Sequence, residues 1–553
     1  MLGCDCFYWN KVSELHEHDS IPNPFSLPAP LPHWPQGDGF ATGKICLGEL
    51  EVAQISTFKS IWSLSSSRGK PKGVTFYSPE GIPDGFFCLG HYCQCKDLPM
   101  RGFVLVAREL HKYELLDLPP LKKPRNYSLV WSADSQHHGP GYIWLPNSPT
   151  GYRAMGFLVT NTPVEPSVND IRCVRVDLTD SCEACDLISD ADFWVWSSRP
   201  CRRGMFSRGV SVGTFFCSSY MTAEYDVLTT ACLRNQDPSL HAMPNLSQIH
   251  AIIQHYGPTL YFHPDEIYLP SSVQWFFDNG ALLYKDGESD GQRIDSKGSL
   301  LPRGGFNDGK FWIDLPNNDD KRDQLKRGNL ESAELYVHVK PAFGGTFTDI
   351  AMWIFCPFNG PATLKVGLTN ISLNRIGEHV GDWEHFTLRV SNFNGELLSI
   401  YCSEHSGGRW VDASTLEYIN GNKAIIYASK CGHASYAHPG TYIQGSSKLG
   451  IGVRNDVDKS KFFVDSSTKY KIIAAEYLGN AVEEPCWVNY MREWGPTVTY
   501  DAFSEIDKVI NHLPRIFRFS MENVLELFPT ELCGEEGPTG PKEKDNWFGD
   551  ERW

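Results

Sequence analysis

The sequence predicts a mainly β protein with an N-terminal β-prism-like threefold repeat and a C-terminal antiparallel β-sandwich of the jelly-roll type. A helical segment is expected near the C-terminus. Three observations support this fold class. Apolar runs of strand length are separated by turn residues. Gly (48), Pro (36) and aromatic residues (13%) are abundant, which favours strands and turns. One diverged pattern also recurs three times in the first half of the chain.

A chain of 553 residues is long enough for more than one domain. An N-terminal lead-in over residues 1–45, which is proline-rich at 21–38, is the first of five expected segments. The others are the β-prism-like repeat domain (46–220), a connector with modest helical character (221–250), the β-sandwich (251–500), and a helical segment and tail (501–553).

The repeat begins each time at a Trp-Ser pair, at Trp62, Trp131 and Trp196. An apolar strand follows, and then a short strand that ends at glycine, with the third copy abbreviated. One copy cannot bury its own apolar face, whereas three copies around a pseudo-threefold axis can. The closing glycines are Gly90, Gly156 and Gly213.

The second domain contains short apolar runs without long helices between them, which is typical of an antiparallel sandwich. The helical segment is expected over residues 503–527, interrupted at Pro514. The strands are expected at Leu335–Val339, Ile350–Phe355, Phe386–Val390, Leu397–Cys402, Ala424–Ser429 and Ile472–Ala475.

The main candidate site lies where the strand that contains Phe386–Val390 begins. Strand side chains alternate between faces, so Asp382 and Glu384 share a face with the apolar residues that follow. Burying unpaired carboxylates is costly, so a positive group must meet them. Together with the imidazole of His379, the set suits a divalent cation, Ca²⁺ or Mg²⁺.

A buried ion pair with Arg389 or Arg375 is the structural alternative to a metal at this position. Turns at the ends of a sandwich often carry function, so His263 and Asp265 are candidates to line the site, or they form a simple capped turn. His433 is either a buried core histidine or a further residue of the site.

The net charge of −16 argues against bulk electrostatic binding to nucleic acid or to an anionic bilayer. Contact with anionic lipid would need a local basic patch or a bridging cation. No phosphate-binding loop and no Gly-x-Ser-x-Gly elbow is present.

A cytoplasmic location is expected, because the N-terminus lacks the features of a secretory signal and no run reaches the length of a membrane span. In that compartment most of the 17 cysteines are expected to be reduced thiols. Cys4 and Cys6 lie beside aromatic residues near the N-terminus, so they are either sites of acylation that attach the protein peripherally to membranes or part of an unmodified terminus.

Four stretches resemble the plant vacuolar protein sorting-associated protein 62 family, whose domain is labelled as of unknown function. The resemblance extends over nearly the whole chain and implies a link to vesicle or vacuolar trafficking. The stretches are residues 261–266, 342–350, 381–385 and 433–436. The repeat domain, through residues 149–156, resembles β-prism modules of membrane-trafficking proteins such as the vacuolar protein sorting 13 family, which implies protein or lipid docking.

Residues 379–384 also resemble the His-Arg-His-Asp-Trp-Glu motif of the necrosis- and ethylene-inducing-peptide-like cytolysins. That family binds a divalent cation on a β-sandwich, and the resemblance implies His379, Asp382 and Glu384 as the ligands here. Gly381 replaces the second His, and a further Asp ligand has no clear match, with Asn359 the nearest residue. These departures argue against membrane lysis.

The resulting hypothesis is a non-enzymatic, membrane-peripheral adaptor with a divalent cation that bridges to a lipid head group or glycan. Trafficking proteins are further expected partners, and nucleic acid is not. The alternatives are a metal-dependent hydrolase or lyase on a jelly-roll scaffold, a cytolysin-related defence protein, or a structural ion pair with all function in the repeat domain.

Overall fold

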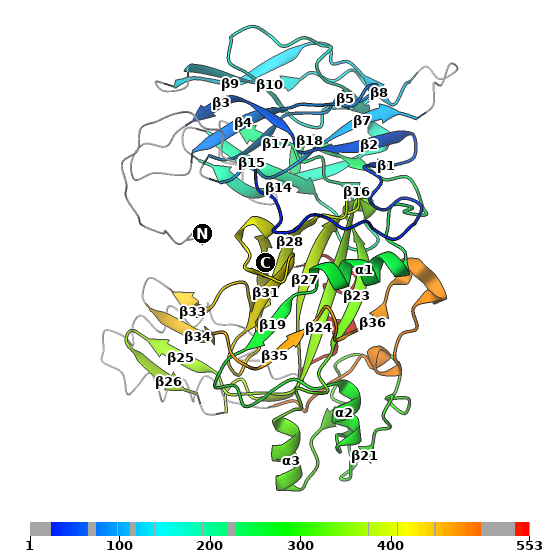
Figure 1. The fold of residues 1–553 in the computed structure, drawn as a ribbon, viewed down its shortest axis with the longest axis vertical. Helices are drawn as coiled ribbons and strands as arrows, with labels where there is room; N and C mark the ends of the chain where they lie inside the picture. The colour runs from blue at the N-terminus through cyan, green and yellow to red at the C-terminus, as the bar shows by residue number, and fades with distance from the viewer. Residues whose placement is uncertain are drawn as a thin grey trace.

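The computed structural model describes residues 24–64, 73–96, 98–110, 118–135, 139–190, 193–218, 227–373, 375–405, 407–446, 450–498 and 537–551. Cys4, Cys6 and the expected helical segment at 503–527 lie outside these residues. The described chain forms an upper body from β1 to β18 and a lower body from β19 onward (Figure 1). Its sheets are largely antiparallel, which confirms the predicted mainly β fold.

The upper body contains three groups of strands, one for each copy of the repeat. The first comprises β1 (Lys44–Cys46), β2 (Leu50–Ile55), β3 (Phe58–Leu64), β4 (Val74–Pro79), β5 (Phe87–Cys88), β6 (Tyr92–Cys95) and β7 (Val104–Glu109). The second comprises β8 (Leu121–Lys122), β9 (Tyr127–Ser135), β10 (Gly139–Pro146), β11 (Tyr152–Arg153), β12 (Leu158–Thr160) and β13 (Cys173–Arg175). The third comprises β14 (Thr179–Ser189), β15 (Trp194–Pro200), β16 (Gly209–Val210), β17 (Phe215–Ser218) and β18 (Val227–Arg234).

Aromatic side chains from the three groups meet in the centre of the upper body. The ring centroids of Trp62 and Trp131 are 5.7 Å apart, and those of Trp131 and Phe193 are 3.9 Å apart. Trp196, the third tryptophan of the repeat, lies in a separate cluster with Cys182 and Cys232. Because strand side chains alternate, Phe193 occupies the core position in the third copy, and Trp196 points to the other face of the sheet.

The closing glycines also meet. A Cβ at Gly90 would lie 2.7 Å from Thr214 Cγ2 and 3.0 Å from the Gly156 Cα, so only glycine fits there. The Thr214 hydroxyl donates to the Met155 carbonyl at 2.6 Å. In the third copy the residue that packs against Gly90 and Gly156 is Thr214, and the closing Gly213 lies one residue before it. These contacts give the repeat a common centre.

The predicted connector at 221–250 differs from the structure. β18 pairs with β14 and β16 and therefore completes a sheet of the upper body. Its residues alternate between exposed and buried at its start, and four consecutive residues from Thr230 to Leu233 are buried, as in a strand that is covered on both faces there. Helix α1 (Leu246–Tyr256) begins only afterwards, at a capping box formed by Asn245 and Gln248.

The lower body is a sandwich of two sheets. One has the order β29 (Gly407–Asp412), β28 (Leu397–Glu404), β27 (His379–Ser391), β24 (Phe347–Asn359), β23 (Leu335–Ala342) and β36 (Tyr470–Ala474). The other has the order β30 (Tyr418–Ile419), β31 (Lys423–Ala428), β19 (Thr259–Phe262) and β35 (Phe463–Asp465), with β32 (Ser435–Tyr436) beside β31. Four of the six strands expected from the sequence fall within these elements, and β31 and β36 each end one residue before the expected bound, at Ala428 and Ala474. The β19–β31 and β23–β36 pairs are parallel.

Smaller elements extend from this sandwich. A sheet at one side contains β25 (Thr363–Val366), β26 (Thr369–Ser372), β33 (Gly440–Ser446) and β34 (Ile451–Val457) (Figure 1). At the far end from the upper body lie α2 (Val273–Asp278), α3 (Asp319–Lys326), β20 (Leu282–Lys285), β21 (Gln292–Arg293) and β22 (Phe311–Asp314). The 3-10 turns among the described residues are Val176–Leu178, Phe343–Gly345, Ala413–Thr415, Glu476–Ala481, Cys486–Asn489 and Pro541–Glu543.

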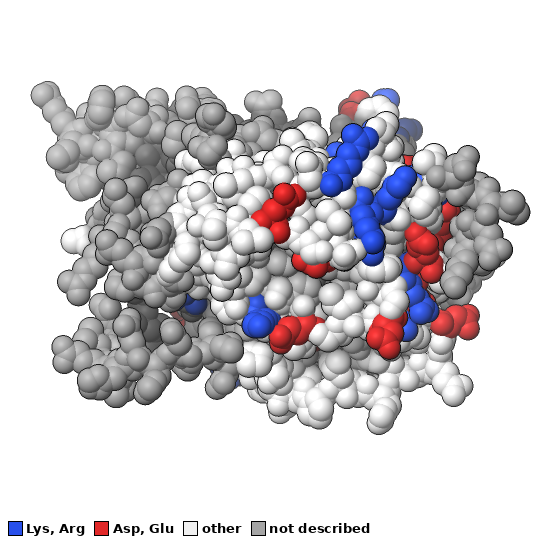
Figure 2. Space-filling model, turned by 90° about the horizontal axis from the view of Figure 1, so that it is seen from above, with Lys and Arg blue, Asp and Glu red and all other residues white. Residues whose placement is uncertain are grey.

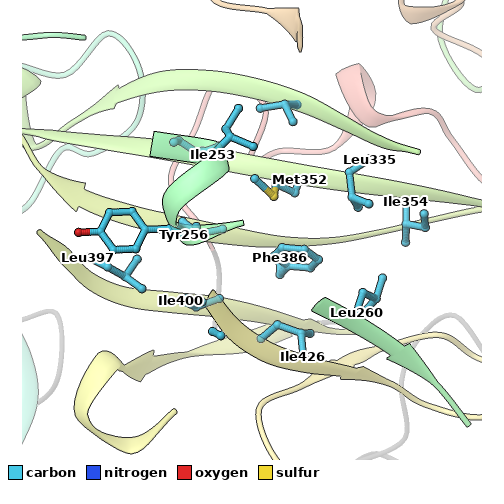
Figure 3. Packing of buried hydrophobic residues seen from close by; sticks show 14 of the residues in the cluster. Ile253, Tyr256, Leu260, Leu335, Met352, Ile354, Phe386, Leu397, Ile400 and Ile426 are labelled. Atoms are coloured by element: carbon cyan, nitrogen blue, oxygen red, sulfur yellow. The ribbon is translucent and has the colours of Figure 1, made fainter. Parts of the chain in front are cut away.

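The sandwich core lies between the two sheets, with Phe386 and Ile400 from one sheet and Leu260 and Ile426 from the other (Figure 3). Tyr256 of α1 closes one edge of this layer. At about 25 cal/mol per Å² of apolar surface, this contact supplies the main driving force for packing the sheets.

The upper and lower bodies meet through charged as well as apolar contacts. The Arg101 guanidinium of the upper body pairs with Glu396 and Asp412 of the lower body. In the C-terminal tail, Asp550 pairs with both Arg203 (2.9 Å) and Arg389 (3.0 Å). On the upper face in Figure 2, Lys and Arg side chains lie beside Asp and Glu on an otherwise mostly uncharged described surface.

Candidate functional site

The site is built on the adjacent strands β24 and β27. In their antiparallel register Cys356 lies opposite Asp382, Ile354 opposite Glu384, and Asn359 opposite His379. Ile354 and Cys356 belong to the sandwich core. The register therefore brings a thiol beside the carboxylate of Asp382 at the edge of the apolar layer.

Gly381 explains how His379 reaches the same face as Asp382. Its φ of +73° interrupts the alternation, so Val380 packs with Trp383 while His379 Nε2 comes within 4.0 Å of Asp382 Oδ1. A Cβ at residue 381 would lie 2.2 Å from the Trp494 carbonyl oxygen. The backbone at this position thus requires glycine.

His433 reaches the site from the turn after β31. Its Nδ1 lies 2.7 Å from Asp382 Oδ2, and its Nε2 lies 2.8 Å from the Tyr268 carbonyl oxygen. Its φ of +53° is unusual for a residue with a Cβ, and the side chain is fully buried. His433 is therefore beside Asp382, and both of its ring nitrogens have partners.

His263 and Asp265 are not brought to Asp382. The Asp265 N–H donates to His263 Nδ1 at 3.1 Å, and the Asp265 side chain is 75% exposed near Lys430. Their neighbour Glu266 lies closer, with Oε2 3.8 Å from His433 Nε2.

Glu266 is fixed by three backbone groups, because it accepts hydrogen bonds from the N–H groups of Ile267, Tyr268 and Cys431. Sequence reasoning missed Glu266 and Cys356 as site residues. The two adjacent acids after Pro264 were a signal for the first, whereas nothing in the apolar run of β24 marked the second.

The electrostatics of the two carboxylates differ. Burial and the nearby charge of Asp382 raise the pKa of Glu384 to about 8, and its carboxylate accepts a hydrogen bond from the Ser403 hydroxyl at 2.7 Å. Burial also acts to raise the pKa of Asp382, but the hydrogen bond and charge of His433 hold this pKa below its usual value. Burial lowers the pKa of His379.

Arg389 and Arg375, the expected partners of a structural ion pair, do not pair with these carboxylates. Arg389 forms two hydrogen bonds of 2.8 Å with Asp349, and Arg375 is exposed. Within the described part of the chain, the ion-pair partners of Asp382 are His379 and His433, and neither Asp382 nor Glu384 has a Lys or Arg within 4 Å.

The fold and the site define a mainly β chain with a threefold repeat body, a sandwich body and a buried cluster of carboxylate, imidazole and thiol groups. Residues 21–551 match the vacuolar protein sorting-associated protein 62 family, and the chain belongs to it. This membership suggests a role related to vacuolar protein sorting.

A curated relative is the vacuolar protein sorting-associated protein 62 of Saccharomyces cerevisiae, which is 25% identical over 284 residues. The match covers 43% of this chain and 58% of the yeast protein, so the chain spans less than two thirds of that relative.

Solved structures show only distant similarity. The crystal structure of GNIP1Aa from Chromobacterium piscinae gives a TM-score of 0.28 at 16% identity, over 38% of this chain and 40% of that one. The structure of NLPPya in complex with glucosamine gives 0.21 at 14% identity, over 39% and 76%. Similarity at this level carries no functional information.

Among the described residues, no helix is long and apolar enough to cross a membrane.

Proposed function

We propose that the chain is a non-enzymatic, membrane-peripheral adaptor in vesicle or vacuolar trafficking that holds a divalent cation beside Asp382. The observation that carries this proposal is the pair of carboxylates at Asp382 and Glu384, which have no Lys or Arg partner within 4 Å in the described structure. A buried carboxylate whose charge no Lys or Arg offsets is costly, and a bound cation reduces that cost. Ca²⁺ and Mg²⁺ both bind carboxylate oxygens, with His379 as a further ligand.

The same strands hold a carboxylate that is compensated in another way. Asp349 is buried, and its two oxygens accept hydrogen bonds from the Arg389 guanidinium. The lower body therefore neutralises one buried acid with a guanidinium, whereas the ion-pair partners of Asp382 among the described residues are both imidazoles. This contrast supports a cation at the second position.

The membrane part of the proposal rests on the insertion that leaves β24 at Asn359 and returns to β27 at His379. The β25–β26 hairpin forms part of this insertion, and Leu368 in its turn is fully exposed. A bound cation and an exposed apolar tip on the same body would together suit an anionic head group or glycan, despite the net charge of −16. Acylation at Cys4 or Cys6 would add a second, independent anchor on the cytoplasmic side.

A hydrolytic or lyase reaction is supported less well. A general base must reach a substrate proton, but His433 is buried and both of its ring nitrogens have partners. Burial also raises the pKa of the Cys356 thiol to about 11, so it is a poor nucleophile. The repeat body would instead provide a docking surface for trafficking proteins.

Thermal unfolding in chelator, Ca²⁺ or Mg²⁺ tests the cation. A ligand that binds only the folded state stabilises it by about 2.7 kcal/mol at one hundred times its Kd. We expect Asp382→Asn and Glu384→Gln to lose this gain. Asp265→Asn, which changes an exposed acid of the neighbouring turn, should keep it. An equal melting temperature in all three conditions would refute the cation proposal.

Flotation with phosphatidylserine vesicles tests the membrane contact separately. Binding should require the cation and weaken in Leu368→Ser. Leu300→Ser is the matched control, because Leu300 is 70% exposed elsewhere on the lower body. Binding that persists in chelator, or that is equal in the two leucine variants, would contradict the proposed contact.

A further inference from the structure

We propose that the preferred cation is a zinc-class transition-metal ion and that Cys356, Asp382 and His433 are its ligands. This inference deepens the proposed function, since it rests on a divalent cation beside Asp382, but it changes the donor set and the ion. The three residues are buried, and one ligand atom from each lies within 4.8 Å of the others. Zinc binds thiolate, imidazole and carboxylate, whereas Ca²⁺ and Mg²⁺ prefer oxygen ligands alone.

The two hydrogen-bond partners of His433 support this assignment. The Tyr268 carbonyl oxygen can only accept, so Nε2 of His433 carries a proton. In the neutral imidazole, Nδ1 is then a lone-pair acceptor, yet it faces a carboxylate oxygen of Asp382 at 2.7 Å. Two acceptors at this distance need a proton or a cation between them.

This arrangement matches the usual environment of a metal-bound histidine. Such a residue normally donates its second ring N–H to a backbone carbonyl or carboxylate, which fixes the ring and its tautomer. Tyr268 supplies that carbonyl, and Glu266 Oε2 lies 3.8 Å from the same nitrogen. The free lone pair is thereby directed at Asp382 and away from Tyr268.

The donors are also held in position before any ion arrives. Cys356 and Asp382 are paired across β24 and β27. His433 sits in a tight turn where its N–H donates to the Ser429 carbonyl at 3.0 Å, and Glu266 binds the Cys431 N–H in the same turn. A site on paired strands and a braced turn loses little entropy on binding.

His379 is the fourth donor in this proposal. Its Nε2 lies 4.0 Å from Asp382 Oδ1, while its Nδ1 is buried without a hydrogen-bond partner. The side chain is 27% exposed, so it is the part of the donor set that solvent reaches. Glu384 is not part of this donor set, and its Oε2 accepts a hydrogen bond from Ser403.

The test is metal titration of the chelator-treated full chain with Zn²⁺ and with Co²⁺, which gives a thiolate charge-transfer band when sulfur binds it. We expect one equivalent to bind, with the band lost and the affinity reduced at least tenfold in Cys356→Ser. Cys402→Ser is the matched control, because Cys402 is buried in the same core but belongs to β28. It should keep both band and affinity.

Asp382→Asn provides a second variant in case Cys356→Ser does not fold, and it should lose Zn²⁺ binding as well. A cobalt band retained in folded Cys356→Ser would overturn the zinc assignment. Stabilisation by Ca²⁺ or Mg²⁺ that needs Glu384 but not Cys356, without zinc binding, would refute this inference and leave the proposed function intact. Failure of every ion to bind would refute both.

Discussion

The imidazole of His433 lies 2.7 Å from the carboxylate of Asp382, although 51 residues separate them in the chain. The pair joins the six-stranded sheet to the turn that follows β31. Burial acts to lower the pKa of His433, but the neighbouring Cys356 and the hydrogen bond with Asp382 raise this pKa well above its usual value. The contact is therefore both a link between the two sheets and the centre of the candidate site.

We first predict energetic coupling between these residues. His433→Asn and Asp382→Asn should each lower the free energy of unfolding by about 3–5 kcal/mol, since each leaves one buried polar partner unmatched. The double variant should lose less than the sum, with a coupling of about 0.5–3 kcal/mol. The free energies of unfolding of the wild type, the two single variants and the double variant are measured by denaturant unfolding in the presence of chelator. The control is a second double-mutant cycle of His433→Asn with Asp265→Asn, in which the losses of stability should be additive. Equal coupling energies in the two cycles would contradict the prediction.

A second prediction concerns Gly381. Gly381→Ala combines a left-handed φ of +73° with a Cβ only 2.2 Å from the Trp494 carbonyl oxygen. The left-handed strain alone costs about 1–2 kcal/mol, and the clash adds to it. Gly287→Ala is the control, because Gly287 has a φ of +79° with nothing within 4 Å of the added Cβ.

Denaturant unfolding should therefore show a larger loss of stability for the Gly381 variant than for the Gly287 variant. Equal losses would mean that the backbone near Trp494 moves aside at little cost.

Sequence patterns predicted the strand that carries Asp382 and Glu384, because alternation depends on local side-chain sequence alone. Contacts set by tertiary pairing were not predictable in this way. Cys356 reaches Asp382 only through the register of β24 with β27, and His433 reaches it through a turn with positive φ. In the repeat core Phe193 stands in place of the expected Trp196 for the same reason, since strand residues an odd number of positions apart point to opposite faces.

The third prediction is that the free energy of unfolding depends on pH through the side chain of His91. Burial lowers the pKa of this side chain from 6.5 to about 4, and its Nδ1 accepts the Val159 N–H, which requires the unprotonated ring. A lowered folded-state pKa means that the unfolded chain binds more protons between these values, so stability falls as the pH drops from 6.5 to 4. At about 1.4 kcal/mol per pKa unit, the loss is on the order of 3 kcal/mol.

Denaturant unfolding at several pH values between 4 and 7 measures this effect as the difference between wild type and His91→Gln, which keeps an acceptor but does not titrate. The slope of stability against pH should be shallower in the variant. Parallel curves for the two proteins would show that His91 does not contribute.

The fourth prediction concerns the C-terminal tail, which Glu551 fastens to the lower body. Its carboxylate lies 2.9 Å from His385 Nε2 and accepts a hydrogen bond of 2.5 Å from the Thr387 hydroxyl. Although burial disfavours the charged form, the charge and hydrogen bond of His385 lower the pKa of Glu551 to about 2. The stabilisation is thus complete above the ordinary carboxyl pKa of 4.5 and is lost as the pH falls through about 2.

Glu551→Gln should therefore destabilise the protein by about 2–3 kcal/mol at neutral pH, because charged hydrogen bonds in a buried site are lost. The tail should also become cleavable in limited proteolysis, since Asp550 beside it would no longer bridge Arg203 and Arg389. Glu543→Gln, which changes a partly exposed acid of the same tail, is the control. If both variants are cleaved at the wild-type rate, Glu551 does not fasten the tail, and the contacts of Trp547, fully buried against His338, must hold it instead.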